Sequence, residues 1–520
     1  MGRVASAFSP VIRTERGSRT PLHKQIYDTF RALIVEGKVR PGEPVPSTRA
    51  LAQELAISRI PVLNAYAQLL AEGYFESRAG SGTFVSLAVP EQMISVPARG
   101  RREGTARSGP RPVSQRSIML PPHDPSRGFG PGAFSVGQPA LDHFPLRVWS
   151  KLVARHTSNA GPAALRYSDP MGRPEFREAI ANYLRTARAV DCDASQVMVV
   201  SGSQQALEIS ARVLLDPDSQ VWIEEPGYWL LRHALILAGC RMVPVPVDAE
   251  GLDVAAGIRL CRRARAAFVI PSHQFPMGVT MSASRRLQLL EWAQSSGAWI
   301  IEDDYDSEYR YGSLPVASLQ GLDRHARVIY IGTFSKTLFP SLRLGYVVIP
   351  PDLVERFKAV RFATDICPPY LHQAVMAEFI SQGHLSRHIR KTRMLYRARR
   401  RALVDAIRSE FGDALEITGC EAGMHLVVLL PRGVPDREIA ARAAQEKLWL
   451  WPLSTAYAGK AVRQGFILGF ASTAEEEMLP AVRRLKALIG KGTPNHGVND
   501  GTMRAEGPPR GRNRVKMTGL

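Results

Sequence analysis

Residues 328–345 decide the fold of the second half of this chain, and they read Val-Ile-Tyr-Ile-Gly-Thr-Phe-Ser-Lys-Thr-Leu-Phe-Pro-Ser-Leu-Arg-Leu-Gly. The apolar start predicts a short buried strand. Lys336 follows that strand directly, and Arg343 comes seven residues later. Upstream, Asp303 and Tyr305 follow another short apolar run, at 299–301. A lysine, an arginine and an Asp-x-Tyr pair therefore come just after predicted strands.

Short apolar runs alternate with helical periodicity around this stretch. We expect further strands at 197–200, 221–223 and 267–270, and helices at 202–215, 228–238 and 284–295. This alternation predicts an α/β domain built around a mostly parallel sheet. Ligands bind at the carboxyl ends of the strands in such sheets. The singled-out residues are expected to meet at that edge.

These residue types match the chemical needs of pyridoxal phosphate (PLP). Lys336 can hold the aldehyde as a Schiff base, and Asp303 can keep the pyridine nitrogen protonated. Tyr305 can donate to the ring oxygen, and Tyr228 can stack on the ring. A phosphate needs a helix N-terminus, hydroxyl groups and an arginine. The phosphate candidates are Ser203, Gln204, Thr333, Ser335 and Arg343.

The first part of the chain predicts a different kind of domain. An apolar helical face runs from Leu22 to Ile34, and Ser47 and Ser58 stand where N-caps of two further helices belong. The turn at 80–82 lies between two short strand-like runs. Three helices and a hairpin make a winged helix-turn-helix over residues 20–87. Its third helix would enter the major groove of double-stranded DNA.

The overall charge agrees with a polyanionic partner. The net charge is +19, and residues 1–87, 88–127 and 491–520 each carry +4 of it. General solubility is the alternative explanation. Residues 88–127 are rich in Gly and Pro and predict a flexible basic linker, whose arginines either add DNA affinity or are simply solvated. Residues 491–520 predict a disordered basic tail.

The remaining features exclude several classes of protein. There is no apolar run of eighteen residues and no secretory signal at the N-terminus, so we expect a cytoplasmic protein. Five scattered cysteines indicate neither a disulfide framework nor a zinc site. We therefore expect no metal.

Residues 21–85 resemble the DNA-binding domain of GntR-type regulators. The likeness rests on the segments 41–49, 58–62, 72–74 and 80–85. It implies DNA contacts by Arg49, Ser58, Arg59 and the wing from Arg78 to Gly80. Pro61 stands where the family commonly has threonine, so one hydroxyl contact is missing from this set.

Residues 128–490 resemble the aspartate aminotransferase superfamily of fold type I. The likeness implies a small subdomain at about 350–490, completed by the N-terminal segment of the domain. Tyr167 matches the tyrosine that reaches the cofactor phosphate of the neighbouring subunit, which implies a domain-swapped homodimer with shared sites. Together with the GntR-like head, the segments 271–276 and 302–308 resemble the MocR/GabR regulators.

Two departures from active aminotransferases bear on function. Phe275 replaces the usual asparagine of the Asn-Pro-x-Gly loop, and Ile467 replaces the arginine that grips the substrate carboxylate. Arg232 and Arg463 are candidates for holding an unusual ligand instead.

The resemblance thus implies a PLP-dependent transcriptional regulator that is not an enzyme. It would sense a small amino compound through aldimine exchange at Lys336. Two alternatives stay open. One is an active aminotransferase that carries a DNA-binding head, and the other is an interaction protein with a vestigial PLP fold.

Overall fold

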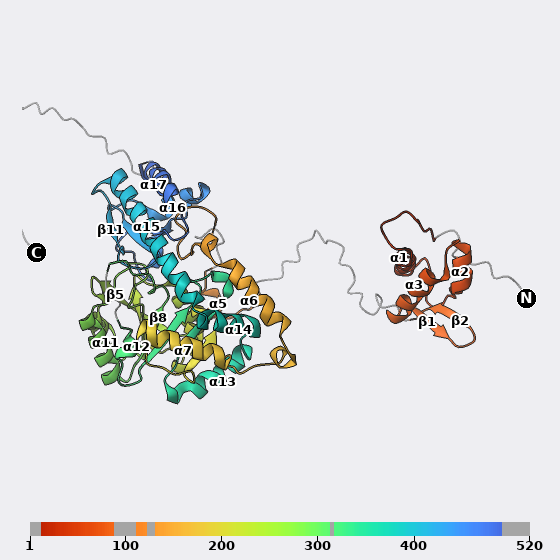
Figure 1. Ribbon diagram of the computed structural model, residues 1–520, viewed down its shortest axis with the longest axis horizontal. Coiled ribbons are helices and arrows are strands. Elements are labelled where there is room, and N and C mark those ends of the chain that lie inside the picture. Colours follow the sequence, from red (N-terminus) through yellow and green to blue (C-terminus); the bar gives the residue numbers. More distant parts are fainter. Residues whose placement is uncertain (1–11, 88–110, 122–129, 313–316, 491–520) are drawn as a thin grey trace, which may run out of the picture. The chain divides into compact units, whose positions relative to one another are not determined.

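The computed structural model describes residues 12–87, 111–121, 130–312 and 317–490. The chain divides into two compact units, unit 1 from Met1 to Pro112 and unit 2 from Val113 to Leu520. Figure 1 shows both, coloured along the sequence. The predicted tail and residues 88–110 and 122–127 of the predicted linker lie outside the described residues.

Unit 1 contains three helices and a two-stranded wing. The elements are α1 (Leu22–Val35), α2 (Thr48–Glu54), α3 (Arg59–Ala71), β1 (Phe75–Arg78) and β2 (Gly82–Val85). Ser47 caps α2 by accepting a hydrogen bond from the amide of Ala50 at 3.1 Å. The strands pair antiparallel, with Phe75 opposite Val85. This is the winged helix-turn-helix that the sequence predicts.

Three aromatic rings form the centre of the core of unit 1. Phe30 of α1, Tyr66 of α3 and Phe75 of β1 pack edge to face, with ring centroids 5.1 to 5.6 Å apart. The Tyr66 hydroxyl also donates to the carbonyl of Pro46 at 2.9 Å. These contacts hold α3 against α1 and the wing, while the first turn of α3 stays exposed.

Unit 2 is built on an eight-stranded sheet with the strand order β3-β10-β9-β8-β7-β4-β5-β6. Strands β4, β5, β7, β8 and β9 run parallel, whereas β10 and β6 are antiparallel to their neighbours. The strands are β3 (Val197–Val200), β4 (Gln220–Glu225), β5 (Arg241–Asp248), β6 (Gly251–Leu252), β7 (Ala266–Val269), β8 (Trp299–Asp304), β9 (Val328–Thr333) and β10 (Gly345–Val348). Strands β3, β7, β9 and β10 are fully buried, as expected when helices cover both faces.

Helices connect and cover these strands. They are α6 (Leu146–Ser158), α7 (Pro174–Arg188), α8 (Ser203–Leu214), α9 (Trp229–Ala238), α10 (Val254–Leu260), α11 (Ala283–Ser296), α12 (Leu319–Leu322), α13 (Val354–Asp365) and α14 (Tyr370–Ser381). Local signals define their ends. Ser282 caps α11 through the amide of Arg285, and Gly297 ends the same helix with a φ of 69°.

A smaller sheet completes unit 2. Its strand order is β11-β12-β14-β13, all antiparallel, and its elements are β11 (Glu416–Thr418), β12 (His425–Leu429), β13 (Trp451–Pro452), β14 (Gly465–Gly469), α15 (His384–Phe411), α16 (Asp436–Gln445) and α17 (Glu475–Gly490). Elements α16, α17 and β11 lie at one end of unit 2, and α11, α12 and α13 lie at the other (Figure 1). Phe134, from the N-terminal segment of unit 2, is fully buried in the core of this sheet and its helices.

One part of the predicted linker is ordered. Residues Gln115–Ile118 form the short helix α5, which packs against α9. Arg116 donates to the carbonyl of Leu237 at 3.3 Å. The absence of apolar periodicity hid this element, because a single polar contact rather than an apolar face positions it.

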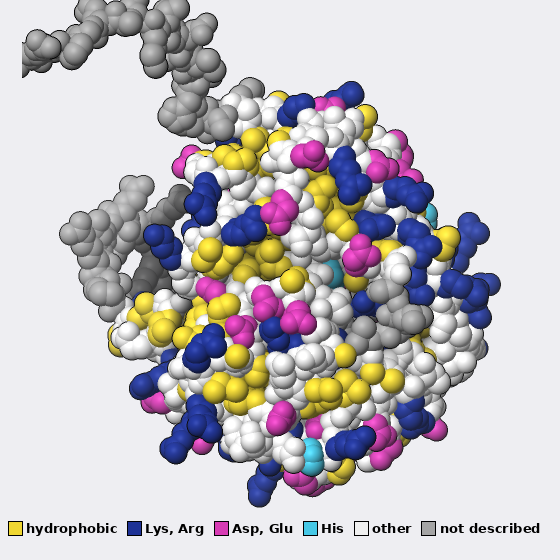
Figure 2. Space-filling view, turned by 90° about the vertical axis from the view of Figure 1, so that its left-hand side faces the viewer, with side chains coloured by type: hydrophobic (Ala, Val, Ile, Leu, Met, Phe, Trp, Pro, Cys, Tyr) yellow, Lys and Arg dark blue, Asp and Glu magenta, His cyan; other side chains and the backbone are white. Residues whose placement is uncertain are grey.

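The described surface carries both acidic and basic side chains. Among the described residues, no helix has the length and apolar character needed to cross a bilayer. On the face shown in Figure 2, acidic and basic side chains alternate with small apolar patches.

Candidate functional site

A cavity of about 370 Å³ opens at the carboxyl edge of the large sheet. Every residue proposed for the PLP site lines it except Tyr167: Ser203, Gln204, Tyr228, Asp303, Tyr305, Thr333, Ser335, Lys336 and Arg343. Val136 and Gly137 reach the cavity from the N-terminal segment of unit 2. Met424, His425 and Trp451 reach it from the smaller sheet. The site thus lies between the two sheets.

Lys336 lies in the cavity, and its charge is only weakly stabilised there. Its Nζ donates to the carbonyl of Gly137 at 3.0 Å. Burial lowers the pKa of the lysine, and the carboxylates of Asp306 and Asp303 oppose this effect. A lowered pKa favours the neutral, nucleophilic amine. Gly137 has a φ of +71°, which favours glycine, and a Cβ there would lie 2.4 Å from Nζ, so a larger residue would strain the backbone and displace the amine.

Asp303 ends in the cavity with an unsatisfied oxygen. Its Oδ1 is buried and has no hydrogen-bond partner among the described residues. Burial and the neighbouring Asp304 raise the pKa of Asp303 to about 7, and Lys336 counteracts them. A buried carboxylate without a donor is costly. A protonated ring nitrogen would supply the missing donor.

A second group of residues forms an anion-binding corner at the start of α8. Ser203 and Gln204 occupy the first turn of this helix, where the backbone amides lack partners within the helix. Arg343 donates to the carbonyl of Ser201 at 2.5 Å and lies over Gly202, whose φ is +89°. A Cβ at Gly202 would come within 3.2 Å of the guanidinium. Thr333 and Ser335 also line the cavity, and the Thr333 hydroxyl accepts from the amide of Ser335 at 3.2 Å.

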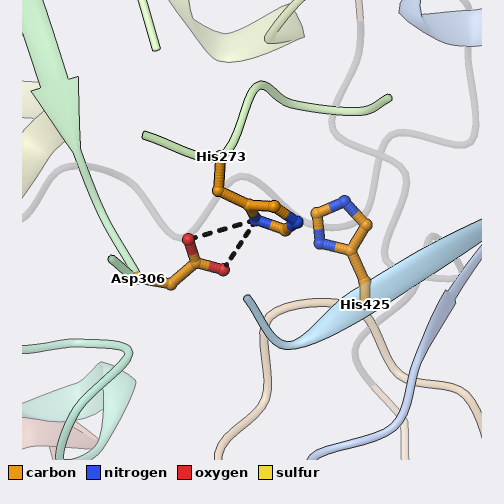
Figure 3. A group of neighbouring side chains, drawn as sticks. All are labelled: His273, Asp306 and His425. Atoms are coloured by element: carbon orange, nitrogen blue, oxygen red, sulfur yellow. Dashed lines mark hydrogen bonds and ion pairs between the residues drawn. The ribbon is translucent and has the colours of Figure 1, made fainter. Parts of the chain in front are cut away.

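Tyr305 is held by a buried group that includes His273, Asp306 and His425. His273 Nδ1 lies 3.0 Å from the Tyr305 hydroxyl and 3.2 Å from each carboxylate oxygen of Asp306. His273 Nε2 has no hydrogen-bond partner among the described residues and points toward the ring of His425 (Figure 3). Burial and His273 lower the pKa of His425 to about 3. The three side chains carry metal-ligand atom types within 4.8 Å of one another, although the sequence indicated no metal site.

A buried ion pair anchors the end of β8 behind the cavity. Arg188, the last residue of α7, donates to Asp304 Oδ2 at 2.9 and 2.5 Å. The Tyr330 hydroxyl donates to the same oxygen at 2.5 Å. Glu302 accepts from the amides of Leu319 and Gln320, both at 3.0 Å. Sequence reasoning missed this network. The feature of the sequence that could have revealed the network is the acidic run 302–308, because alternate residues of a strand point to opposite faces.

The two arginines proposed for an unusual ligand do not line this cavity and have local partners. Arg232 donates to the carbonyls of Thr455 and Ala456 at 2.9 and 3.1 Å. Arg463 is exposed and pairs with Glu416 at 2.7 Å. Neither lines the cavity. Both are used by local structure, Arg232 to fix the loop after β13 and Arg463 to join strands of the small sheet.

The proposed DNA contacts lie on exposed parts of unit 1. Ser58 is the N-cap residue of α3, and its side chain makes no capping hydrogen bond. Arg59 donates to the Thr48 hydroxyl at 3.1 Å, and Arg49 is exposed on α2. On the wing, Arg78 pairs with Glu76 and lies 4.5 Å from the centroid of the Phe84 ring. Gly80, with a φ of +75°, makes the turn at the wing tip.

Comparisons with known proteins agree with both units. Residues 22–85 match the family of bacterial regulatory proteins of the gntR type, and residues 133–485 match aminotransferase class I and II. The probable rhizopine catabolism regulatory protein MocR of Rhizobium meliloti is 39% identical over 91% of this chain and 94% of its own length. The chain belongs to the MocR-type regulators.

Solved structures support the fold of unit 2 in this MocR-type regulator. The Pyrococcus horikoshii kynurenine aminotransferase is 28% identical, with a TM-score of 0.67, over 73% of this chain and 97% of that one. The Thermus thermophilus α-aminoadipate aminotransferase LysN is 29% identical, with a TM-score of 0.64, over 69% and 92% of the two chains. LysN was solved with N-(5'-phosphopyridoxyl)-L-leucine. The fold of unit 2 is therefore that of PLP-dependent enzymes.

The residues of this MocR-type regulator fit the cofactor that its fold implies. Asp303 offers a buried, unsatisfied acceptor, and the corner at Ser203 and Arg343 offers donors for a phosphate. Lys336 lines the same cavity. Tyr167 is 82% exposed and lies outside the cavity of its own chain.

The first prediction concerns the pH dependence of Asp303. Its folded pKa of about 7 exceeds its ordinary value of 3.8, so the folded protein binds the extra proton between these pH values. Stability contributed by this group therefore falls as pH rises from about 4 to 7, by at most about 1.4 kcal/mol per pH unit. Without cofactor, we expect the melting temperature of Asp303→Asn minus that of the wild type to increase as the pH rises from 5 to 8.

The exposed carboxyl of Asp216 provides the control, because Asp216→Asn should leave the pH dependence unchanged. If Asp303→Asn differed from the wild type by the same amount at both pH values, Asp303 would not titrate in this window. Added PLP should raise the melting temperature of the wild type more than that of Asp303→Asn.

The second prediction concerns DNA binding. Arg59→Ala removes a guanidinium from the exposed first turn of α3. The binding free energy for the DNA upstream of the regulator's own gene should weaken by about 1–3 kcal/mol. Gel-shift titrations at two salt concentrations measure the loss and the salt dependence. Lys24→Ala is the control, because Lys24 pairs with Asp28 on α1 at 2.8 Å. Equal affinity of Arg59→Ala and the wild type would remove α3 from the interface.

Proposed function

We propose that this regulator holds PLP in the cavity of unit 2 and changes its DNA binding when an amino compound takes the place of Lys336. The unsatisfied oxygen of Asp303 is the observation that carries the proposal. No other group in the described cavity explains a buried carboxylate facing the lysine. When bound, PLP supplies an aldehyde carbon that forms a covalent bond with one amine at a time.

Each residue of the cavity has a distinct task in this proposal. Asp303 accepts a hydrogen bond from the protonated ring nitrogen, and Tyr305 donates to the ring oxygen. His273, backed by Asp306, orients the Tyr305 hydroxyl through the 3.0 Å contact. Arg343 and the first turn of α8 neutralise the phosphate.

The amine of Lys336 occupies the reactive position until an effector arrives. Its lowered pKa keeps part of the lysine neutral and able to return when the effector leaves. Released Lys336 can still donate to the carbonyl of Gly137, which lies within reach at 3.0 Å. The effector shifts an existing equilibrium between two arrangements only by its difference in affinity for them.

Steady transamination is the second candidate function. It is favoured by the presence of Lys336, Asp303, Tyr305 and Arg343 in one cavity. Against it stands Ile467, which is fully buried where aminotransferases place the arginine that grips the carboxylate. Without that positioning the reaction loses much of its rate. Formation of a keto acid from an amino acid and a second keto acid, measured over many turnovers, distinguishes an enzyme from a sensor.

The third prediction separates sensing from DNA binding. Lys336→Ala should bind the upstream DNA with unchanged affinity but show no response to an effector amine in gel shifts. Lys358→Ala is the control, because Lys358 lies on α13 with its Nζ 3.9 Å from Asp169. A normal response of Lys336→Ala would mean that replacement of this lysine is not the switch.

The fourth prediction concerns a shared site in a dimer. We propose that Tyr167, exposed beside the equally exposed Leu165, completes the phosphate site of a partner subunit. Tyr167→Ala and Lys336→Ala should each weaken or abolish PLP binding as homodimers. A hybrid dimer of one subunit of each variant then regains one intact site. In that site, Lys336 comes from the Tyr167→Ala subunit and Tyr167 comes from the Lys336→Ala subunit. Visible absorption of the mixed, refolded dimer measures this recovery, and no recovery would place Tyr167 outside the partner's site.

A further inference from the structure

One wall of the cavity is built only from apolar side chains. Val136, Ile270, Phe275 and Trp451 line it. They belong to a single buried cluster that continues behind the wall with Val427, Leu429, Leu453 and Ile467. The cluster joins the N-terminal segment, the edge of the large sheet and the small sheet.

The strand register places Ile467 on the face of the small sheet that is turned to this cavity. His425 of β12 lines the cavity, and Val427 lies two residues further on the same face. Ile467 of β14 is directly opposite Val427 in the antiparallel ladder. The alternate residues Leu426 and Val428 belong to the separate core beneath the sheet. A longer side chain at 467 would therefore extend toward the cavity.

Within a single chain, the charges that line the cavity leave no group for an effector carboxylate. Among the described residues that line it, the permanent cations are Lys336 and Arg343. Lys336 serves the cofactor, and Arg343 lies at the start of α8 in the phosphate corner. The remaining charged side chains are the carboxyls of Asp303 and Asp306. This set attracts an ammonium group and repels an anion.

We infer that the effector is a primary amine with an apolar body and no carboxylate, an inference that rests on the proposed function. An ionised carboxylate pressed against Phe275 and Trp451 would lose its hydration without gaining a partner. The same apolar wall stabilises a hydrocarbon or aromatic group by removing it from water. A binding site discriminates far more strongly against a ligand that leaves a polar group unpaired than against one with an extra methylene. The presence or absence of a carboxylate therefore decides which amine the cavity binds.

The test compares matched pairs of amines on the full-length, PLP-loaded protein. 2-Phenylethylamine and L-phenylalanine differ only in the α-carboxylate, and pentylamine and 5-aminopentanoate differ only in a distal one. Each compound is titrated while the visible absorption spectrum of the bound cofactor and the gel shift on upstream DNA are recorded. We expect the amine of each pair to act at a concentration at least about tenfold lower, or about 1.4 kcal/mol tighter.

Ile467→Arg tests the wall itself. The new guanidinium can pair with a carboxylate. The ratio of the concentrations at which L-phenylalanine and 2-phenylethylamine act should therefore fall at least about tenfold or reverse. Ile467→Met conserves volume without charge and should keep the preference of the wild type. A retained visible band shows that the cofactor site of either variant is intact.

The outcomes separate this inference from the proposed function. A wild-type protein that binds PLP but prefers the amino acid, or responds to neither member of a pair, would overturn the apolar-amine inference alone. A wild-type protein that develops no visible band on loading would overturn the proposed function, and the inference with it. Should Ile467→Arg fail to fold, the wild-type comparison still decides.

Discussion

The buried carboxylate of Asp303 is the constraint on which the rest of the site depends. Placing a carboxyl group in an apolar environment costs free energy, which is why its pKa rises to about 7. The surrounding residues keep it there. Glu302 and Asp304, its neighbours along β8, are tied to the backbone of α12 and to Arg188. The strand end is thus held from the opposite face, while Asp303, whose buried Oδ1 has no hydrogen-bond partner among the described residues, lines the cavity.

In the proposed function, the walls of the cavity turn a scaffold that suits an enzyme toward sensing. The cofactor face carries the polar residues Asp303, Tyr305, Lys336 and Arg343, whereas Val136, Ile270, Phe275 and Trp451 form an apolar cluster on another part of the lining. An isoleucine at 467 would matter little if a second cation could reach the cavity instead. Arg232 lies nearby, but it donates to the carbonyls of Thr455 and Ala456 and cannot turn inward without breaking both hydrogen bonds. The loss of anion binding is therefore a property of the whole wall.

Sequence reasoning reached the parts of the site that strand ends specify. The positions of Lys336, Asp303 and Tyr228 follow from apolar strands of known direction, because parallel strands end at one edge. The contacts between segments far apart in sequence were missed. Arg188 reaches Asp304 across 116 residues, and His273 meets His425 only because the small sheet packs on the large one. No spacing rule encodes such contacts, and the short helix α5 escaped for the related reason that one hydrogen bond positions it.

A sensor and an enzyme place opposite demands on the same lysine. An enzyme must convert the bound amine, so its occupancy reports flux, while a sensor must release the amine unchanged, so its occupancy reports concentration. Lys336, with a lowered pKa and a resting partner at Gly137, is suited to repeated displacement and return. The apolar wall removes the grip on a carboxylate that would orient the amine for conversion. In the proposed function, the cavity therefore retains reversible capture and loses the positioning that chemistry after capture requires, which is the combination that a concentration-dependent regulator needs.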